Sequence, residues 1–254
     1  MTRAMKISSA RDIDHLAITT TTPEEMVGRL QQLGFVFTPQ GVEPRCICFQ
    51  PDRDDIPNFI ALFEGEPQVA LAINLAEVEG EERRHTWETE DGLPVEADLI
   101  VGQGAGPPPW FPVAHRAPEA FMEPEWIVHP NGALGLVAVH IVADDPAGLA
   151  KTLTDGWRAE SEEVFDGCVL VRTGVVELLV WSAAAWQVEY RAIEAMAPQA
   201  LPQVVGIAIA VERPSPLQAL LRANNVYFAL GNGDRVIVPA EQAGGLVVEF
   251  MPQT

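Results

Sequence analysis

The 254-residue sequence predicts an α+β protein built from four copies of one unit, a strand followed by a helix and three more strands. The unit is clearest where an apolar strand ends shortly before a proline that opens an amphipathic helix. Such strands are expected at 135–143 and 204–211, and their prolines are Pro146 and Pro214. The same order of elements recurs elsewhere in the chain, which indicates internal repetition.

Composition and charge limit the classes of function. Hydrophobic residues make up 48% of the chain and charged residues 20%, which is typical of a globular protein, and no apolar run is long enough to cross a bilayer. The 16 Lys and Arg against 36 Asp and Glu give a net charge of −20, which disfavours nucleic acid and anionic membranes as partners. A start without an apolar signal region and three cysteines without a disulfide framework predict a reduced, cytoplasmic protein. Cys46 and Cys48 are expected on one face of a strand as small buried hydrophobes.

The first unit begins with a strand at 13–18 and a helix opened by Pro23. Thr22 is in position to cap this helix, and Gly34 is in position to end it. Its remaining strands are expected at 35–37, 45–50 and 58–63.

The second unit is degenerate. It starts with a buried strand at 69–75, but the stretch 77–91 is acidic and weakly patterned. Strand signals return at 94–101 and 110–115. An ordered connection at 116–133 then separates the halves of the chain, and His129 is expected to form hydrogen bonds within it. The expected domains are 1–120 and 121–254.

The third and fourth units are better formed. After the strand at 135–143 comes a helix that stops at Gly156 and Trp157, and Asp166-Gly167 predicts a hairpin. The remaining strands of both units are expected at 162–165, 168–172, 174–180, 227–230, 235–238 and 245–251.

Two glutamates interrupt otherwise apolar closing strands. Alignment of the third and fourth units places Glu177 opposite Glu249, and it places His140 opposite Ala208 because each lies six residues before its proline. Burial of a carboxylate is costly unless another group pairs with it. These glutamates are therefore candidates for a functional site.

Several motifs together resemble the vicinal oxygen chelate superfamily, and within it the two-domain glyoxalase-like proteins of the glyoxalase, bleomycin-resistance and dioxygenase type. The resemblance covers nearly the whole chain. It rests on the repeated unit and on the stretches 12–16 (DIDHL), 115–119 (HRAPE), 126–133 (WIVHPNGA) and 244–250 (GGLVVEF). It implies that the first unit pairs with the second, and the third with the fourth, to make two half-open barrels, each enclosing a cup.

In metal-dependent members, the cup binds a divalent ion through residues of the first and last strands of each unit. Carried over to this chain, the resemblance implies His15 and His115 as ligands in the first cup. The place where such proteins often carry a glutamate holds Ala61, with Asn74 as a weak substitute. The second cup offers His140, Glu177 and Glu249, with Ala208 at the fourth place. Zinc, iron, manganese or nickel would suit this second set.

The resemblance implies a divalent-metal-dependent lyase, isomerase or dioxygenase acting on a small oxygenated metabolite, with Glu177 or Glu249 as general base. The alternative is a metal-free protein that binds or sequesters a small ligand, as bleomycin-resistance proteins do, and Ala61 and Ala208 favour it. A third interpretation is a degenerate scaffold that pairs only with itself. Related folds often dimerise, so a homodimer is expected from the resemblance alone.

Overall fold

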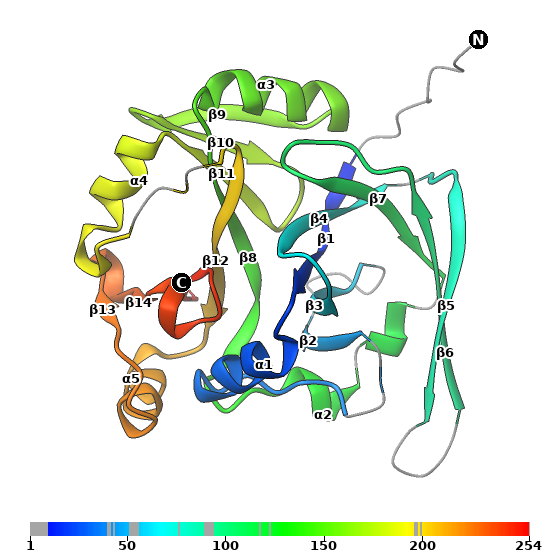
Figure 1. The fold of residues 1–254 in the computed structure, drawn as a ribbon, viewed down its shortest axis with the longest axis horizontal. Helices are drawn as coiled ribbons and strands as arrows, with labels where there is room; N and C mark the ends of the chain where they lie inside the picture. The colour runs from blue at the N-terminus through cyan, green and yellow to red at the C-terminus, as the bar shows by residue number, and fades with distance from the viewer. Residues whose placement is uncertain are drawn as a thin grey trace.

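In a computed structural model, the chain forms two mixed β-sheets with helices packed between and beside them (Figure 1). The structure describes residues 10–253 except 40–41, 43, 51–55, 76, 89–93, 117, 122, 196–197 and 199. The first sheet has seven strands in the order β2-β3-β1-β4-β7-β6-β5. Its strands are β1 (Ala10–Thr20), β2 (Arg45–Phe49), β3 (Asn58–Glu64), β4 (Gln68–Leu75), β5 (Gly80–Glu88), β6 (Pro94–Gly102) and β7 (Trp110–His115).

The second sheet has eight strands in the order β13-β14-β15-β12-β8-β11-β10-β9. Its strands are β8 (Ala133–Val142), β9 (Glu160–Phe165), β10 (Cys168–Arg172), β11 (Glu177–Trp181), β12 (Gln203–Val211), β13 (Ala229–Leu230), β14 (Val236–Val238) and β15 (Val247–Pro252). The α-helices are α1 (Pro23–Gln32), α2 (Pro124–Ile127), α3 (Pro146–Trp157), α4 (Ala183–Glu189) and α5 (Pro214–Ala223). Short 3₁₀ helices are η1 (Pro118–Phe121), η2 (Arg191–Ile193), η3 (Asn232–Asp234) and η4 (Ala240–Gln242). No helix in the described ranges is long and apolar enough to span a membrane.

The strand order confirms the predicted α+β fold of paired units. At the centre of each sheet the first strands of two units lie antiparallel, β1 beside β4 and β8 beside β12. Each of these strands is flanked on its other side by the last strand of its own unit, in the parallel orientation: β3, β7, β11 and β15, respectively. The first sheet therefore contains the first two units, and the second sheet contains the last two.

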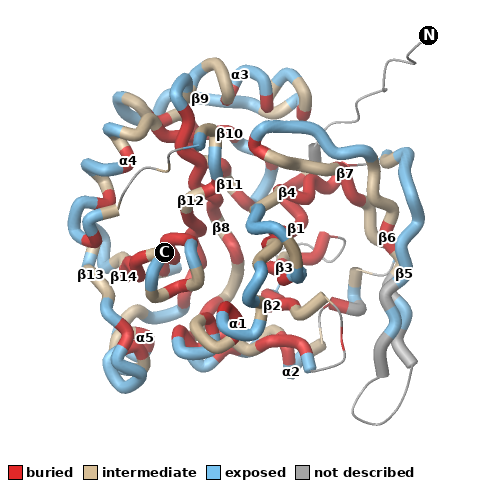
Figure 2. The backbone as a smooth tube through the Cα atoms, viewed as in Figure 1, coloured by how far each residue is buried: buried red, intermediate tan, exposed pale blue. Residues whose placement is uncertain are grey.

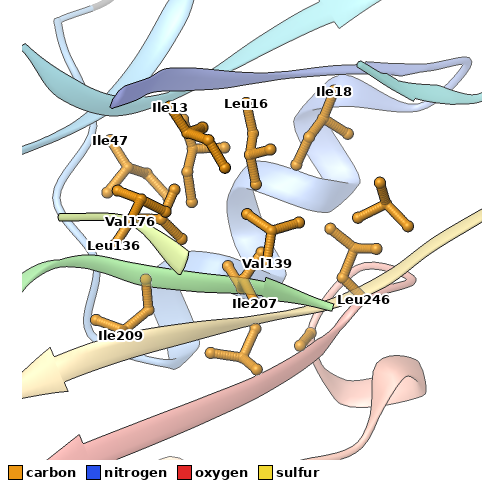
Figure 3. Close-up of a cluster of buried hydrophobic side chains, with 14 of the residues drawn as sticks. Ile13, Leu16, Ile18, Ile47, Leu136, Val139, Val176, Ile207, Ile209 and Leu246 are labelled. Carbon is orange, nitrogen blue, oxygen red and sulfur yellow. The ribbon is translucent and has the colours of Figure 1, made fainter. Parts of the chain in front are cut away.

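The largest core lies between the two sheets and contains side chains from both. Figure 3 shows Leu16 of β1 facing Val139 of β8, with Ile207 of β12 beside it. Helices α1, α3 and α5 also contribute buried side chains to this core. In Figure 2 the central strands are accordingly mostly red, whereas the described part of β5 at the edge is pale blue. The face that is turned away from this core is here named the first cup in the first sheet and the second cup in the second sheet.

The predicted boundary between domains falls inside η1, at residues 120 and 121. Because the largest core draws on both sheets, the two halves share their main apolar contact. The division into two domains stays a prediction, as does the homodimer. All three cysteines are free and buried, and Cys46 and Cys48 pack in one apolar cluster, as predicted.

Helix ends follow the sequence signals with one exception. In α3, the carboxylate of Asp145 accepts a hydrogen bond from the backbone N–H of Gly148 at 2.9 Å. Thr22 precedes α1 but its side chain makes no capping hydrogen bond, so that prediction is wrong. Gly34 ends α1 as expected, with φ of +87°, and a Cβ there would lie 2.9 Å from that of Asn131. Only glycine satisfies both conditions.

One further prediction of secondary structure is wrong. Residues 35–37 form no strand, because the backbone N–H of Val36 donates instead to the imidazole Nδ1 of His129 at 3.0 Å. The second unit is degenerate, as predicted: its weakly patterned stretch 77–91 contains β5, which pairs with β6 from residue 80 to residue 88. The second unit thus has a strand where the other units have a helix.

His129 fixes the connection between the halves, as predicted. Its Nδ1 accepts from Val36, so its Nε2 donates to the carbonyl of Cys48 at 2.9 Å. The ring also meets Phe35 and Phe49 edge-on, with centroids 5.7 and 5.3 Å away. Burial lowers the pKa of His129 to about 4, against the raising effect of the Cys48 carbonyl. The imidazole of His129 is therefore neutral in the folded protein at pH 7, the form in which it makes both hydrogen bonds.

His129→Gln should reduce the amount by which the free energy of unfolding falls in acid. The unfolded chain protonates this histidine near pH 6.5 and the folded chain near pH 4, so its contribution is complete above pH 6.5 and declines as the pH falls toward 4. That decline is about 2 to 3 kcal/mol in the free energy of unfolding between pH 7 and pH 4.5. Urea unfolding of both proteins at these two pH values measures it. Equal declines in wild type and variant would contradict the role given to His129.

Candidate metal centre

A β-bulge brings two neighbouring polar residues of β1 to the same face. The register of β1 against β4 shifts between Ile13 and His15, which makes Asp14 the extra residue. Ile13 and Leu16, on either side, both belong to the core between the sheets. Asp14 and His15 therefore both face the first cup, although consecutive residues of a regular strand point to opposite faces.

His115, at the end of β7, completes the cluster. One carboxylate oxygen of Asp14, Oδ1, lies 2.6 Å from Nδ1 of His15 and 2.9 Å from Nε2 of His115. The ligand atoms of these three residues all lie within 4.8 Å of one another. The side chains are at most 6% exposed. On β4, the amide Nδ2 of Asn74 donates to the other oxygen, Oδ2, of Asp14 at 3.0 Å.

The cluster favours an ionised carboxylate. Burial by itself would raise the pKa of Asp14, but the charges and hydrogen bonds of His115 and His15 outweigh it and hold the pKa well below its ordinary value. Burial lowers the pKa of His15, against the raising effect of Asp14. An ionised carboxylate and a neutral imidazole are the protonation states in which these side chains bind a metal ion.

Aromatic rings hold the two imidazoles in place. His15 stacks on Phe59 at a centroid distance of 4.2 Å, and Phe59 stacks in turn on Phe121 at 4.7 Å. Phe121 also meets His115 edge-on at 5.4 Å. Beside these rings is a cavity of about 70 Å³, lined by His15, Pro44, Phe59, Ala61, Phe63, Arg83, Leu99, Val101, Phe111, His115 and Phe121. Two imidazoles thus border a small, mostly apolar space.

The donor set fits a divalent transition metal. Two imidazoles and one carboxylate are typical ligands of iron, manganese or zinc, and the set leaves coordination positions open. Two buried polar atoms at this site, Asn74 Oδ1 and His115 Nδ1, are among the five such atoms of the described residues that have no hydrogen-bond partner. Unpaired buried atoms of this kind are costly, and a nearby cation would satisfy a lone pair on either of them.

The structure brings His15 and His115 together, whereas sequence reasoning missed Asp14 as their partner. Ala61 lines the same cavity but offers no donor atom. Asn74 contacts the cluster through Asp14. The motif at 12–16 contains Asp14, but regular strand alternation places that residue opposite to His15. The bulge that reverses this has no clear signal in the sequence.

In the second cup, His140 and Glu249 come together but Glu177 does not join them. Nε2 of His140 lies 3.5 Å from Oε2 of Glu249, and both side chains are buried. Glu177, at the start of β11, forms an ion pair with Arg172, which also pairs with Glu162 at the surface. Glu177 therefore takes no part in the function proposed below.

In the second cup, an arginine side chain provides the positive charge that pairs with Glu249. The guanidinium of Arg235 pairs with Glu249 at 2.7 Å and also with Glu189 of α4. The hydroxyl of Tyr190 donates to Glu249 at 2.7 Å, and the indole of Trp181 donates to Nδ1 of His140 at 3.2 Å. Burial by itself would raise the pKa of Glu249, but these partners, His140 foremost, lower it overall.

Aromatic side chains also fill the second cup. Trp181, Trp186 and Tyr190 pack in one buried cluster there, with Trp186 in the middle of α4 and Tyr190 as the residue that follows it. Centroids of these two rings are 4.0 Å apart, and both rings lie within 5.7 Å of the imidazole of His140. The charged groups of this cup, Glu249 and Arg235, are therefore paired within the chain itself, whereas the indole N–H of Trp186 has no hydrogen-bond partner among the described residues.

Comparison with known proteins establishes the fold. No family model and no curated protein sequence matches the chain. A hypothetical protein from Staphylococcus aureus matches with a TM-score of 0.57 at 8% identity, covering 95% of this chain and 99% of that one. An E323L mutant of homoprotocatechuate 2,3-dioxygenase from Brevibacterium fuscum matches with a TM-score of 0.58 at 12% identity, covering 100% and 74%.

The Mn(II)-bound glyoxalase from Novosphingobium aromaticivorans matches with a TM-score of 0.55 at 10% identity, covering 97% of this chain and 83% of that one. Likeness at such low identity shows the fold alone. The chain accordingly has the glyoxalase/dioxygenase-like fold, consistent with the resemblance found in its motifs.

Proposed function

We propose that the protein is a metal-dependent enzyme of the vicinal oxygen chelate type, with its centre in the first cup. Asp14, His15 and His115 would hold one divalent ion, with iron, manganese, nickel and zinc as the candidates. The observation that carries the proposal is the convergence of two imidazoles on one buried carboxylate, within 4.8 Å of one another. The fold shared with a Mn(II)-bound glyoxalase supports it.

A bound ion would act as a Lewis acid, polarising two adjacent oxygens of a small substrate and stabilising negative charge that develops on them. The chain's own residues prepare the site. Without an ion, Asp14 accepts hydrogen bonds from both imidazoles, which keeps the three ligand groups together, and Asn74 holds the other oxygen of Asp14. A bound ion would take the place of the two imidazole hydrogen bonds. Phe59 and Phe121 exclude water from one side of the rings. Lyase, isomerase and dioxygenase reactions all suit such a site.

Metal analysis tests the proposal. The protein, purified without a metal-binding tag, is incubated separately with Fe(II), Mn(II), Ni(II) and Zn(II), passed through a desalting column and assayed by mass spectrometry for metal. We expect about one equivalent of at least one metal per chain. Less than about a tenth of an equivalent of every metal would overturn the proposal.

The second candidate function is metal-free binding of a small ligand. The hydrogen bonds that Asp14 accepts from His15 and His115 favour it, because they satisfy the carboxylate without an ion. Ala61, which lines the cavity without offering a ligand atom, favours it as well. Metal analysis separates the two functions, since the second predicts a protein that stays without metal after every incubation.

A further inference from the structure

Arg83 lies in the same row of side chains as His115. On the first sheet, Arg83 of β5 is paired with Leu99 of β6, and Leu99 is paired with His115 of β7. Residues that are directly opposite on neighbouring strands project to the same face. Arg83 and Leu99 both line the cavity beside His15 and His115. Figure 1 shows β5 and β6 at the edge of the sheet, beyond β7.

The guanidinium of Arg83 makes a longer ion pair than the guanidinium groups of two nearby arginines. Arg84, on the opposite face, bonds to Asp98 at 2.8 Å, and Arg116 bonds to Glu82 at 2.7 Å. The ion pair of Arg83 with Glu81 is 3.6 Å long, and the two side chains are 58% and 74% exposed. Exposed pairs of this kind contribute little free energy. The guanidinium is therefore able to accept another anionic partner.

The position of this arginine is unusual for the chain. With 36 acidic and 16 basic residues, the protein as a whole repels anions. Among the residues that line the cavity, Arg83 alone carries a permanent charge, and the others are apolar side chains and two histidines. The positive charge of Arg83 therefore offsets the repulsion of anions in the cavity beside the candidate metal centre.

We infer that Arg83 binds a carboxylate group of the substrate. The planar guanidinium matches the two oxygens of a carboxylate and can bond to both at once. Arg83 stands two strands from His115, which is roughly 10 Å at the usual strand spacing, and its own side chain spans part of that distance. The substrate would thus be a small acid with two adjacent oxygens at one end and a carboxylate a few carbons away. This inference rests on the proposed function.

Two five-carbon acids test the inference. 2-Oxoglutarate and 2-oxopentanoate share a 2-oxo acid end, and only the first has a second carboxylate. Calorimetric titration of the metal-loaded protein should show that 2-oxoglutarate binds at least about 10-fold more tightly. Arg83→Ala should reduce this ratio to about one while leaving the affinity for 2-oxopentanoate unchanged. Arg84→Ala, a matched change on the opposite face, should preserve the ratio, and Glu81→Gln should not lower it.

The results separate this inference from the proposed function. Metal content and thermal unfolding of each variant are measured first, and an exposed residue such as Arg83 should change neither. If wild type takes up no metal, both proposals fail. If it takes up one equivalent but binds neither acid, binds both alike, or keeps its preference in Arg83→Ala, only the assignment of Arg83 is overturned.

Discussion

Asp14→Ala should lower the affinity for Mn(II) or Zn(II) at least about 100-fold. Changes to residues that merely orient a metal ligand typically cost 10-fold to 100-fold in affinity. Asp14 would be a ligand itself, and without the ion its carboxylate also holds both imidazoles in place through hydrogen bonds of 2.6 and 2.9 Å. Its removal therefore takes away one donor and loosens two others. Competition with a chromogenic chelator measures the dissociation constant.

Variants of the glutamates serve as controls for Asp14. Glu177→Gln changes a partly exposed carboxylate and Glu249→Gln a buried one in the second cup, and neither should alter metal affinity. Asp14→Asn keeps the size of the side chain and should also bind metal weakly, which guards against misfolding of the alanine variant. A loss of metal affinity in Glu249→Gln, with Asp14→Ala unaffected, would place the metal in the second cup and contradict the proposed site.

Arg235→Ala should lower the free energy of unfolding by about 3 kcal/mol. Removal of one partner of a buried ion pair leaves the other charge uncompensated, which typically costs 3 to 5 kcal/mol. Glu249 is 1% exposed and Arg235 is partly exposed, so the low end of this range applies. Without the guanidinium, Glu189 of α4 also loses its partner. Chemical denaturation at pH 7 measures the change.

A surface arginine gives the comparison for Arg235. Arg172 also pairs with two glutamates, but its side chain is half exposed, so Arg172→Ala should cost no more than about 1 kcal/mol. The double variant Arg235→Met/Glu249→Met should be more stable than Arg235→Met alone, because it removes the unpaired charge. Equal losses in Arg235→Ala and Arg172→Ala would mean that the second cup does not depend on its internal cation.

Much of the fold was readable because its signals are local. A proline opens each of the long helices α1, α3 and α5, glycine ends α1, and Asp166-Gly167 forms the hairpin between β9 and β10. The periodic apolar strands indicated the repeated unit, and the family resemblance implied the pairing of units that the strand order shows. The absence of a strand at 35–37 could not be predicted, because the backbone N–H of Val36 donates to the side chain of His129, more than 90 residues away.

The candidate site was only half readable. The family resemblance of two motifs implied His15 and His115. Asp14 joins them through a β-bulge, and a bulge depends on the pairing of strands rather than on the local sequence. Arg83 faces the cavity through the pairing of β5 with β6, which the weak pattern of 77–91 concealed. In the second cup, Arg235 and Tyr190 meet Glu249 only after folding, so the sequence could not show that its charge is already compensated.

X-ray absorption spectroscopy of the zinc-loaded or manganese-loaded protein tests the central claim, a metal held by two imidazoles and a carboxylate in the first cup. The extended fine structure of wild type should show scattering from two imidazoles. One imidazole should remain in His115→Ala, and two should remain in His140→Gln. Two imidazoles in His115→Ala, or the loss of one in His140→Gln, would contradict the account.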